Sequence, residues 1–251
     1  DYHGTMEAYK EAKGRLFASL NVSRRKPDVP KIIAVNEDDP AAEYFKEFPA
    51  DQMLGYGIVK GAYVGRNLEE KPDGTKFLLK IPNGEAEVNY KIPGRMNVYN
   101  AVAAASVAVA HKINIQAIKA GLEKMRPVPG RIEVIAEGQP YTVVVDYAHS
   151  EDSLNQVLPM MKRLTEGRLI TVFGATGDRD KEKRPKMGAV LHKLSDVIIV
   201  TNDDLYTEDP RQIAAMLREG IPREEGDGLW QVLDRREATR LALSMAKPGD
   251  T

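Results

Sequence analysis

The spacing of apolar side chains in the first half of the chain predicts helices on either side of a group of strands. Residues 6–20 carry apolar side chains at alternating intervals of three and four, which is typical of a helix with one apolar face. A short strand is expected at 31–35. Alternating segments separated by Gly, Asn and Pro turns indicate antiparallel strands within 55–92. The pattern becomes helical again at 97–111 and at 115–124.

The second half of the chain alternates between strands and helices. Apolar runs predict four strands, at 141–145, 169–173, 196–200 and 229–233. The helices expected between and after them lie near 151–165, 184–194, 209–219 and 235–246. Alternation of this kind implies a mostly parallel, Rossmann-like sheet covered by helices, so the expected fold class is α/β.

One segment between the two halves breaks the pattern and is the expected domain boundary. Residues 125–130 contain two prolines and a glycine, which interrupt both helices and strands. We therefore expect one domain at 1–129 and a second at 130–251. Both ends of the chain resemble the middle of a longer segment, so a fragment of a larger protein is expected.

Composition narrows the class of protein without identifying it. The 251 residues are 42% hydrophobic and 29% charged with a formal net charge of −1, which gives no basic surface for nucleic acid. The absence of cysteine excludes disulfides and thiolate metal sites and is compatible with a cytoplasmic protein. No apolar run reaches the roughly 18–20 residues of a membrane span, so no membrane partner is expected.

Polar or glycine-rich segments follow three of the predicted strands, at 146–149, 174–180 and 201–204. The carboxyl ends of parallel strands lie along one edge of a sheet, where α/β proteins bind their ligands. Turn and helix-cap chemistry explains any one of these segments by itself. Their combination favours a functional site.

Three polar side chains in the first half are candidates for chemistry. Lys13 stands on the expected apolar face, where it either extends to the surface or is a desolvated amine able to form a carbamate that suits Mg²⁺. Asn97 and Asn100 stand one turn apart at the start of a predicted helix. They are either an N-cap and a solvated amide or amides that pair with the N6 and N7 edge of adenine.

The candidates in the second half lie next to the domain boundary and at the strand ends. Arg131 either reaches a phosphate or ribose or forms a surface ion pair, and Asp146 and His149 are available for a ligand such as ribose hydroxyls. Ser150 is expected to be the N-cap of the next helix. The charged loop at 174–185 precedes a helix, which indicates an anion site, although the chain has no GxxxxGK[ST] phosphate loop.

Six stretches together resemble the Mur ligases, and within them the UDP-N-acetylmuramoyl-tripeptide synthetases. They occur in the family's order, cover nearly the whole chain, and are specific only in combination. The stretches are DYHGTMEAYKEAK at 1–13, GRMNVYNA at 94–101, GRIE at 130–133, VDYAH at 145–149, the charged loop at 173–185 and TEDP at 207–210. The resemblance implies that 1–129 is the later portion of a P-loop-type central ATPase domain and that 130–251 is a Rossmann-like C-terminal ligase domain.

The resemblance also implies roles that the spacing does not show. Lys13 falls on the family's carbamylated lysine, which helps to hold a catalytic Mg²⁺. Lys183 is expected near the phosphates or the substrate, and Arg179 next to the incoming amino acid. The positions that match the nucleotide site are Asn97, Asn100, Arg131, Asp146 and His149.

The implied reaction is the ATP-dependent ligation of a free amino acid to UDP-N-acetylmuramoyl-L-alanyl-D-glutamate, a peptidoglycan precursor. Similar enzymes phosphorylate the precursor's terminal carboxylate, and the amine of the amino acid then displaces phosphate from the acyl phosphate. A cytoplasmic monomer is expected, with ATP and Mg²⁺ as cofactors. The open alternatives are a folylpolyglutamate-synthetase-like ligase and a non-catalytic protein that binds nucleotides or muropeptides.

The chain departs from the family pattern in four places. The glycine-rich phosphate loop, the metal-binding histidine before the Asp-Tyr-His-Gly stretch and the terminal Gly-Lys-Gly-His-Glu segment have no counterpart, so the 251 residues alone are expected to be inactive. Members that add diaminopimelate usually carry Asp-Asn-Pro-Arg where this chain has Asp203, Asp204, Leu205 and Tyr206. Loss of the arginine and gain of a carboxylate favour a lysine-like acceptor.

Overall fold

The computed structural model describes residues 3–251, which form two compact units. The first unit ends at Pro127 and the second begins at Val128. Asp1 and Tyr2, which open the first stretch of the family resemblance, lie outside the described residues. No helix within the described part of the chain is both long enough and apolar enough to cross a membrane.

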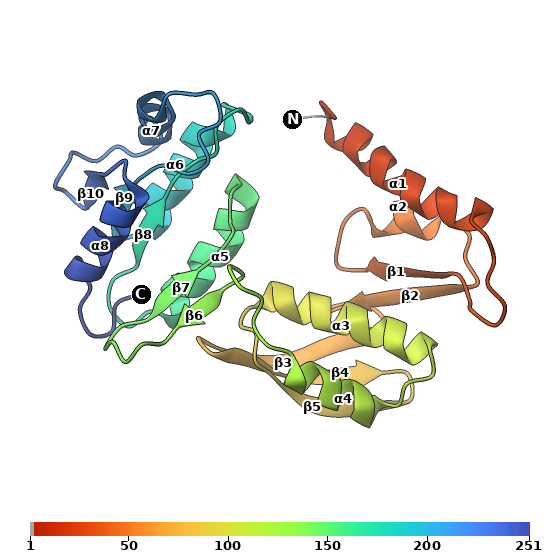
Figure 1. The fold of residues 1–251 in the computed structure, drawn as a ribbon. Helices are drawn as coiled ribbons and strands as arrows, with labels where there is room; N and C mark the ends of the chain where they lie inside the picture. The colour runs from red at the N-terminus through yellow and green to blue at the C-terminus, as the bar shows by residue number, and fades with distance from the viewer. Residues whose placement is uncertain (1–2) are drawn as a thin grey trace. The chain divides into compact units, whose positions relative to one another are not determined.

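The first unit is built on a five-stranded mixed sheet (Figure 1). The β1–β2 and β2–β3 pairs are parallel, whereas β3–β4 and β4–β5 are antiparallel. The antiparallel strands predicted within 55–92 are therefore confirmed. In spatial order the strands are β1 (Ile32–Asn36), β2 (Gln52–Gly57), β3 (Tyr63–Lys71), β4 (Gly74–Ile81) and β5 (Gly84–Tyr90).

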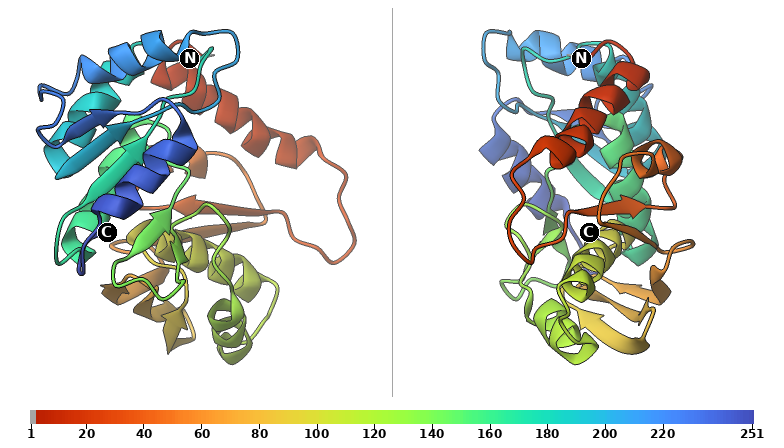
Figure 2. Two further views of the ribbon diagram at one scale, coloured as in Figure 1. Left: turned by 60° about the vertical axis from the view of Figure 1, so that its left-hand side comes forward. Right: turned by 90° about the vertical axis from the view of Figure 1, so that its right-hand side faces the viewer.

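Two helices lie against this sheet, and they confirm the helices predicted at 97–111 and 115–124. Helix α3 (Arg95–Ala110) contacts β1 to β4, and α4 (Ile115–Lys124) contacts β5 (Figure 2). Val98 of α3 shares a core with Phe77 and Leu79 of β4. Gly65 in β3 allows this close approach, because a Cβ there would lie 2.7 Å from Cγ1 of Val98.

Helix α1 (Met6–Val22) is present as predicted, but it buries a different face. Its buried residue is Gly14, which lies against the rings of Tyr44 and Phe48 at helix α2 (Ala42–Lys46). Met6 and Leu16, expected to face a core, are 73% and 72% exposed. Leu20, also on the expected face, does pack against the core beside Phe17. Hydrophobic spacing was therefore only partly right, because the closest contact uses a glycine, which allows tight packing but contributes no apolar side chain.

The second unit contains the predicted parallel sheet, with strand order β10-β9-β8. Both strand pairs are parallel. Helix α8 contacts β8 and β9, α7 contacts β9, and α6 packs against both α5 and α7. The strands are β8 (Ile170–Phe173), β9 (Val197–Val200) and β10 (Leu229–Gln231); the helices are α5 (Glu151–Leu164), α6 (Lys183–Leu194), α7 (Pro210–Arg218) and α8 (Arg235–Met245).

One predicted member of that sheet lies outside it. The strand expected at 141–145 is present as β7 (Val143–Val145), but it pairs antiparallel with β6 (Glu133–Ile135), which the sequence pattern did not predict. The end of the chain lies between β7 and β8. The amides of Thr142 and Ile170 donate to the carbonyls of the last two residues at 2.9 and 2.8 Å, so this segment separates two strands that alternation alone would make neighbours.

Candidate functional site

The loop that follows β8 is hydrogen-bonded to the loop that follows β9. We call them the β8–α6 loop (174–182) and the β9–α7 loop (201–209). The amide of Gly177 donates to the carbonyl oxygen of Asp204 at 2.7 Å, and the hydroxyl of Thr176 donates to the carboxylate of Asp203 at 3.0 Å. Two of the three predicted strand-end segments therefore meet at one edge of the sheet, as parallel strands require.

Asp178 makes a second connection between the two loops. Its carboxylate accepts hydrogen bonds from the amide and the hydroxyl of Thr207 at 3.2 and 2.8 Å, and its own amide donates to Glu208 at 2.7 Å. Asp178 and Tyr206 have φ angles of 51° and 50°, in the left-handed region that non-glycine residues rarely occupy. These contacts between the loops hold the backbone in that conformation.

Arg179 and Tyr206 present their side chains together at the surface. The guanidinium carbon of Arg179 lies 5.1 Å from the ring centroid of Tyr206, which is a cation–π contact. One guanidinium nitrogen also donates to the carbonyl oxygen of Asp178 at 3.1 Å. Both side chains are exposed, so the remaining donors of Arg179 can bind a carboxylate or a phosphate.

A buried ion pair lies beneath this surface, and sequence reasoning did not find it. Arg184, in the first turn of α6, is fully buried and donates to both carboxylate oxygens of Glu208 at 2.9 and 2.8 Å. Lys181 lies 3.3 Å from the same carboxylate. Chiefly because of the bond from Arg184, the pKa of Glu208 is lowered to about 2. Both residues stand in the family-like stretches, but nothing in their spacing marks them as partners.

Lys183, predicted near phosphates or substrate, is the first residue of α6 and is half-buried. Burial lowers the pKa of its amine, the carboxylate of Asp180 raises it, and the guanidinium groups of Arg179 and Arg184 lower it further. The net direction is downward. An anion bound at this helix start would raise the pKa of Lys183 again, because the helix amides and a lysine both favour negative charge there.

The two aspartates expected to select the acceptor differ in their surroundings. Asp203 forms an ion pair with Arg235 at 3.5 Å in addition to its bond from Thr176. Asp204 is exposed, and its carbonyl rather than its carboxylate meets the β8–α6 loop. The negative charge read from the sequence is thus partly neutralised locally, and Arg179 adds a cation beside Tyr206.

At the end of β7 the structure brings together three of the predicted nucleotide-binding positions. Both carboxylate oxygens of Asp146 are engaged, accepting from the amides of Ile132 at 2.9 Å and Ala148 at 2.8 Å. This turn carries a cluster of flat side chains. The guanidinium of Arg131 lies 4.4 Å from the ring centroid of Tyr147, which is 5.0 Å from the ring of His149. Ser150 caps α5, as predicted.

Asn97 and Asn100 both lie on the first turns of α3. The N-cap is Gly94, with φ 96°, so the interpretation of Asn97 as the cap was wrong. The amide nitrogen of Asn97 donates to the carbonyl of Pro93 at 2.7 Å, and its oxygen accepts from Asn100 at 3.5 Å. Asn100 is exposed and remains accessible for a base edge.

Lys13 is exposed rather than desolvated. Its amine lies 5.2 Å from the ring centroid of Tyr9 on the outward side of α1. Of the two sequence alternatives, the structure shows the surface lysine. Among residues 3–251 no group of three His, Asp or Glu side chains is close enough to hold a metal ion. The described residues therefore do not supply a complete Mg²⁺ site.

Asp38 is a further polar centre that the sequence did not single out. Its carboxylate accepts from the amides of Ile58, Val59 and Lys60 at 2.7–2.9 Å and from the hydroxyl of Tyr99 at 2.9 Å. Burial would raise the pKa of Asp38, but these bonds outweigh it and lower the pKa. Asp38 thereby ties the turn after β2 to α3, the helix that carries both asparagines.

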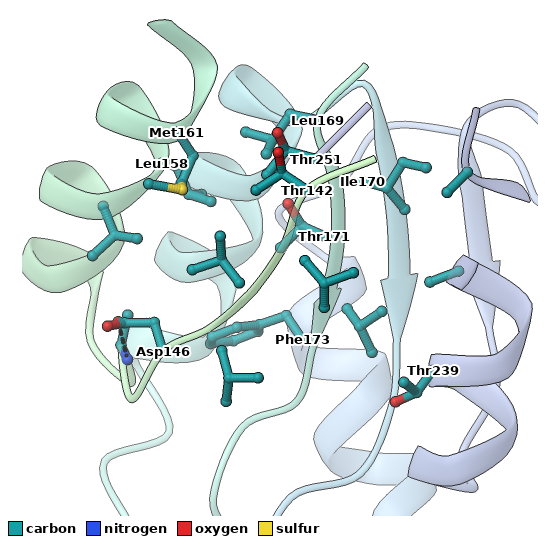
Figure 3. A pocket seen from close by; sticks show the side chains of 18 of the residues that line it. Thr142, Asp146, Leu158, Met161, Leu169, Ile170, Thr171, Phe173, Thr239 and Thr251 are labelled. Atoms are coloured by element: carbon teal, nitrogen blue, oxygen red, sulfur yellow. Dashed lines mark hydrogen bonds between the residues drawn. The ribbon is translucent and has the colours of Figure 1, made fainter. Parts of the chain in front are cut away.

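A cavity of about 310 Å³ lies between α5, α8 and the strands β7 and β8 (Figure 3). Its walls are mostly aliphatic, with Leu158, Met161 and Phe173 among the lining side chains. Asp146 stands at one end of it, with its carboxylate already engaged in the turn. Such a lining suits neither phosphate nor a charged amino acid, so the cavity is not the candidate site.

Comparison with known families matches both units of the chain. The model described as "Mur ligase middle domain" matches residues 1–108, and the model described as "Mur ligase, glutamate ligase domain" matches residues 130–251. The UDP-N-acetylmuramoyl-L-alanyl-D-glutamate–2,6-diaminopimelate ligase of Geobacillus kaustophilus is 40% identical over 251 residues, which cover 100% of this chain and 51% of that protein. The chain thus spans about half the length of the curated relatives it matches.

Solved structures agree with these matches. A structure of a UDP-N-acetylmuramoyl-L-alanyl-D-glutamate–2,6-diaminopimelate ligase is 35% identical, with a TM-score of 0.62, and the match covers 99% of this chain and 50% of that one. The MurF ligase of Thermotoga maritima, solved in complex with ADP, is 17% identical with a TM-score of 0.75, over 100% of this chain and 54% of that one. The second likeness concerns the fold alone.

Proposed function

Because this chain belongs to the Mur ligase family, we propose that it forms the later part of the middle domain and the glutamate ligase domain of an ATP-dependent amino-acid ligase. The proposed reaction joins an amino acid to UDP-N-acetylmuramoyl-L-alanyl-D-glutamate in peptidoglycan precursor synthesis. The observation that carries the proposal is about 40% identity along the whole chain to enzymes named for that reaction. The two linked loops of the second unit support it, because they present cations where a charged substrate can bind.

The proposed chemistry has two steps that conserve all atoms. The terminal carboxylate of the precursor attacks the γ-phosphorus of ATP, ADP leaves, and an acyl phosphate forms. The amine of the amino acid then attacks the acyl carbon, the C–O bond to phosphate breaks, and the amine proton is released as the amide forms. Lys183 would neutralise negative charge on the reacting oxygens, and Arg179 would bind the incoming amino acid.

Each unit by itself offers residues suited to a nucleotide. Asn100 offers an exposed carboxamide, which suits the adenine edge. Arg131 and His149 offer a cation and a flat ring, which suit a phosphate and a base or ribose face. Asp146 would act by shaping the turn, since both of its carboxylate oxygens already accept backbone hydrogen bonds. Asn97 would orient Asn100 through their mutual contact.

The proposal assigns Mg²⁺ one ligand from this chain. When bound, the ion would screen charge on the phosphoryl oxygens. Lys13, as a carbamate, would offer one oxygen ligand. The described residues lack the other ligands, so no step above depends on the ion.

The proposed acceptor is a diamino acid, and two candidates differ in one carboxylate. The relatives are named for 2,6-diaminopimelate, and the free donors of Arg179 beside Tyr206 suit an acceptor with a second carboxylate. Lysine is the second candidate, favoured by Asp204 and by the absence of arginine from the stretch 203–206. The first candidate carries an extra anion and the second does not, so one assay separates them.

The test is phosphate release by the complete gene product with ATP, Mg²⁺ and UDP-N-acetylmuramoyl-L-alanyl-D-glutamate. Lysine, ornithine and meso-diaminopimelate are supplied in parallel, and the product is identified by mass. We expect turnover with meso-diaminopimelate; turnover with lysine alone would establish the second candidate. Absence of turnover with all three from a folded, nucleotide-binding protein would refute the proposed reaction and favour a non-catalytic binder or a folylpolyglutamate-synthetase-like ligase.

Arg179→Met provides the matched site variant, with Arg211→Met as its control. Arg211 is an exposed arginine on α7 in the same unit. Loss of an arginine–carboxylate contact should raise the acceptor KM about tenfold or more, while the control should leave it unchanged.

Gel filtration of the complete gene product tests the expected monomer, and cell fractionation tests the expected cytoplasmic location.

A further inference from the structure

The buried pair Arg184–Glu208 is the structural centre of the two linked loops. Besides both oxygens of Glu208, the guanidinium of Arg184 contacts the carbonyl of Thr176 and the sulfur of Met216, each at 3.3 Å. The side chain of Glu208 is only 9% exposed. A fully buried arginine is expensive to desolvate, and replacing buried ion pairs by hydrophobic residues of similar volume is often neutral or stabilising in other proteins. The pair therefore needs an explanation other than stability.

Glu208 connects three separate parts of the unit. It binds Arg184 of α6 through both oxygens, it accepts the amide of Asp178 from the β8–α6 loop, and it stands itself in the β9–α7 loop. Asp178 in turn accepts both hydrogen bonds of Thr207. The loops are thus joined by charge-assisted bonds in both directions, which are shorter and more directional than neutral ones.

This network lies around Asp178 and Tyr206, the two residues whose φ angles are in the left-handed region. Asp178 stands immediately before Arg179, and Tyr206 immediately before Thr207, so the network holds the backbone next to each partner of the exposed Arg179–Tyr206 contact. Without the bonds to Glu208 and Thr207, both residues would relax toward the ordinary right-handed or extended regions. The side chain of Arg179 would then leave its position over the ring of Tyr206.

We propose that Arg184 and Glu208 are positioning residues for the amino-acid acceptor, acting by holding Arg179 and Tyr206 in place to receive its carboxylate. The inference rests on the proposed ligase function. Among the described residues, no carboxylate lies in ion-pair range of Arg179, whereas both terminal guanidinium nitrogens of Arg184 donate to Glu208 and only its Nε has no hydrogen-bond partner. In this proposal the exposed Arg179 binds the acceptor, and the buried Arg184 holds the two loops together.

The test uses Glu208→Gln and the milder Thr207→Val in the complete gene product. Thr207→Val removes the hydroxyl bond to Asp178 and keeps the size of the side chain, so it remains informative if Glu208→Gln folds poorly. The matched control is Glu225→Gln, which neutralises a carboxylate paired with Arg218 at 3.0 Å elsewhere in the same unit. KM is measured separately for acceptor, ATP and UDP-linked precursor, together with the melting temperature of each variant.

We expect Glu208→Gln to raise the acceptor KM at least tenfold and Thr207→Val about threefold, with the other two KM values within twofold of the parent and the control unchanged. Equal rises for all three substrates, or an unchanged acceptor KM, would show that the pair is only structural.

Hydrogen exchange tests the same role if the parent protein has no ligase activity. The amides of Asp178 and Thr207 should exchange at least tenfold faster in Glu208→Gln, while those of β9 should not. Unchanged exchange at both amides would overturn the positioning role whatever the reaction proves to be.

Discussion

The tight contact between the two loops predicts that Gly177→Ala destabilises the second unit. A Cβ at position 177 would lie 2.7 Å from the carbonyl carbon of Leu205 and closer still to its oxygen. The β9–α7 loop would have to retreat by more than half an ångström, which would break the 2.7 Å bond between Gly177 and Asp204. Overpacking costs about 1–3 kcal/mol and the lost bond about 1 kcal/mol, so we expect a loss of about 2–4 kcal/mol.

Urea unfolding followed by circular dichroism measures this loss. With an m-value of about 2–3 kcal/mol/M, the midpoint should fall by about 1 M. The control is Gly121→Ala in α4, where a Cβ would meet no heavy atom within 4 Å. That change should stabilise the first unit by about 0.5–1 kcal/mol through helix propensity. A Gly177→Ala protein with the parent's midpoint would refute the close approach of the two loops.

Three further predictions follow from the core, the chain end and the charged loop. Leu79→Ala, at a fully buried position, should cost about 3 kcal/mol by urea unfolding, against less than about 1 kcal/mol for Leu243→Ala, which is 40% exposed. Burial would raise the pKa of Asp250, but its bonds from Arg168 outweigh this and lower the pKa to about 2. The stabilisation from this carboxylate is therefore complete above its unfolded pKa of about 4 and is lost as the pH falls toward 2. In urea unfolding at several pH values, the free energy of unfolding of Asp250→Asn should therefore depend less on pH in that window than that of the parent. Lys183→Met should lower turnover of the complete gene product at least about a hundredfold without changing its melting temperature, and Lys183→Arg should recover part of it.

Local sequence signals predicted most elements because their causes are local. Ser150 accepts from the amide of Ser153 and begins α5 at the expected residue, and Asn114 does the same for α4 through the amide of Ala117. Strand-end chemistry placed the β8–α6 and β9–α7 loops at one edge, since that follows from parallel strands alone. Of the two alternatives for Asn97, the N-cap was wrong because Gly94, three residues earlier, has the positive φ angle at which α3 begins.

What the sequence by itself determined is the order and type of most elements, the cap at Ser150 and the resemblance to the Mur ligases, because each depends on neighbours in the chain. Only the tertiary structure decided that α1 buries Gly14 and exposes Lys13, that β7 leaves the parallel sheet, and that Glu208 pairs with Arg184. The two partners of that pair stand 24 residues apart. Burial and pairing at such separations depend on which surfaces pack together, and neither periodicity nor residue type along the chain contains that information.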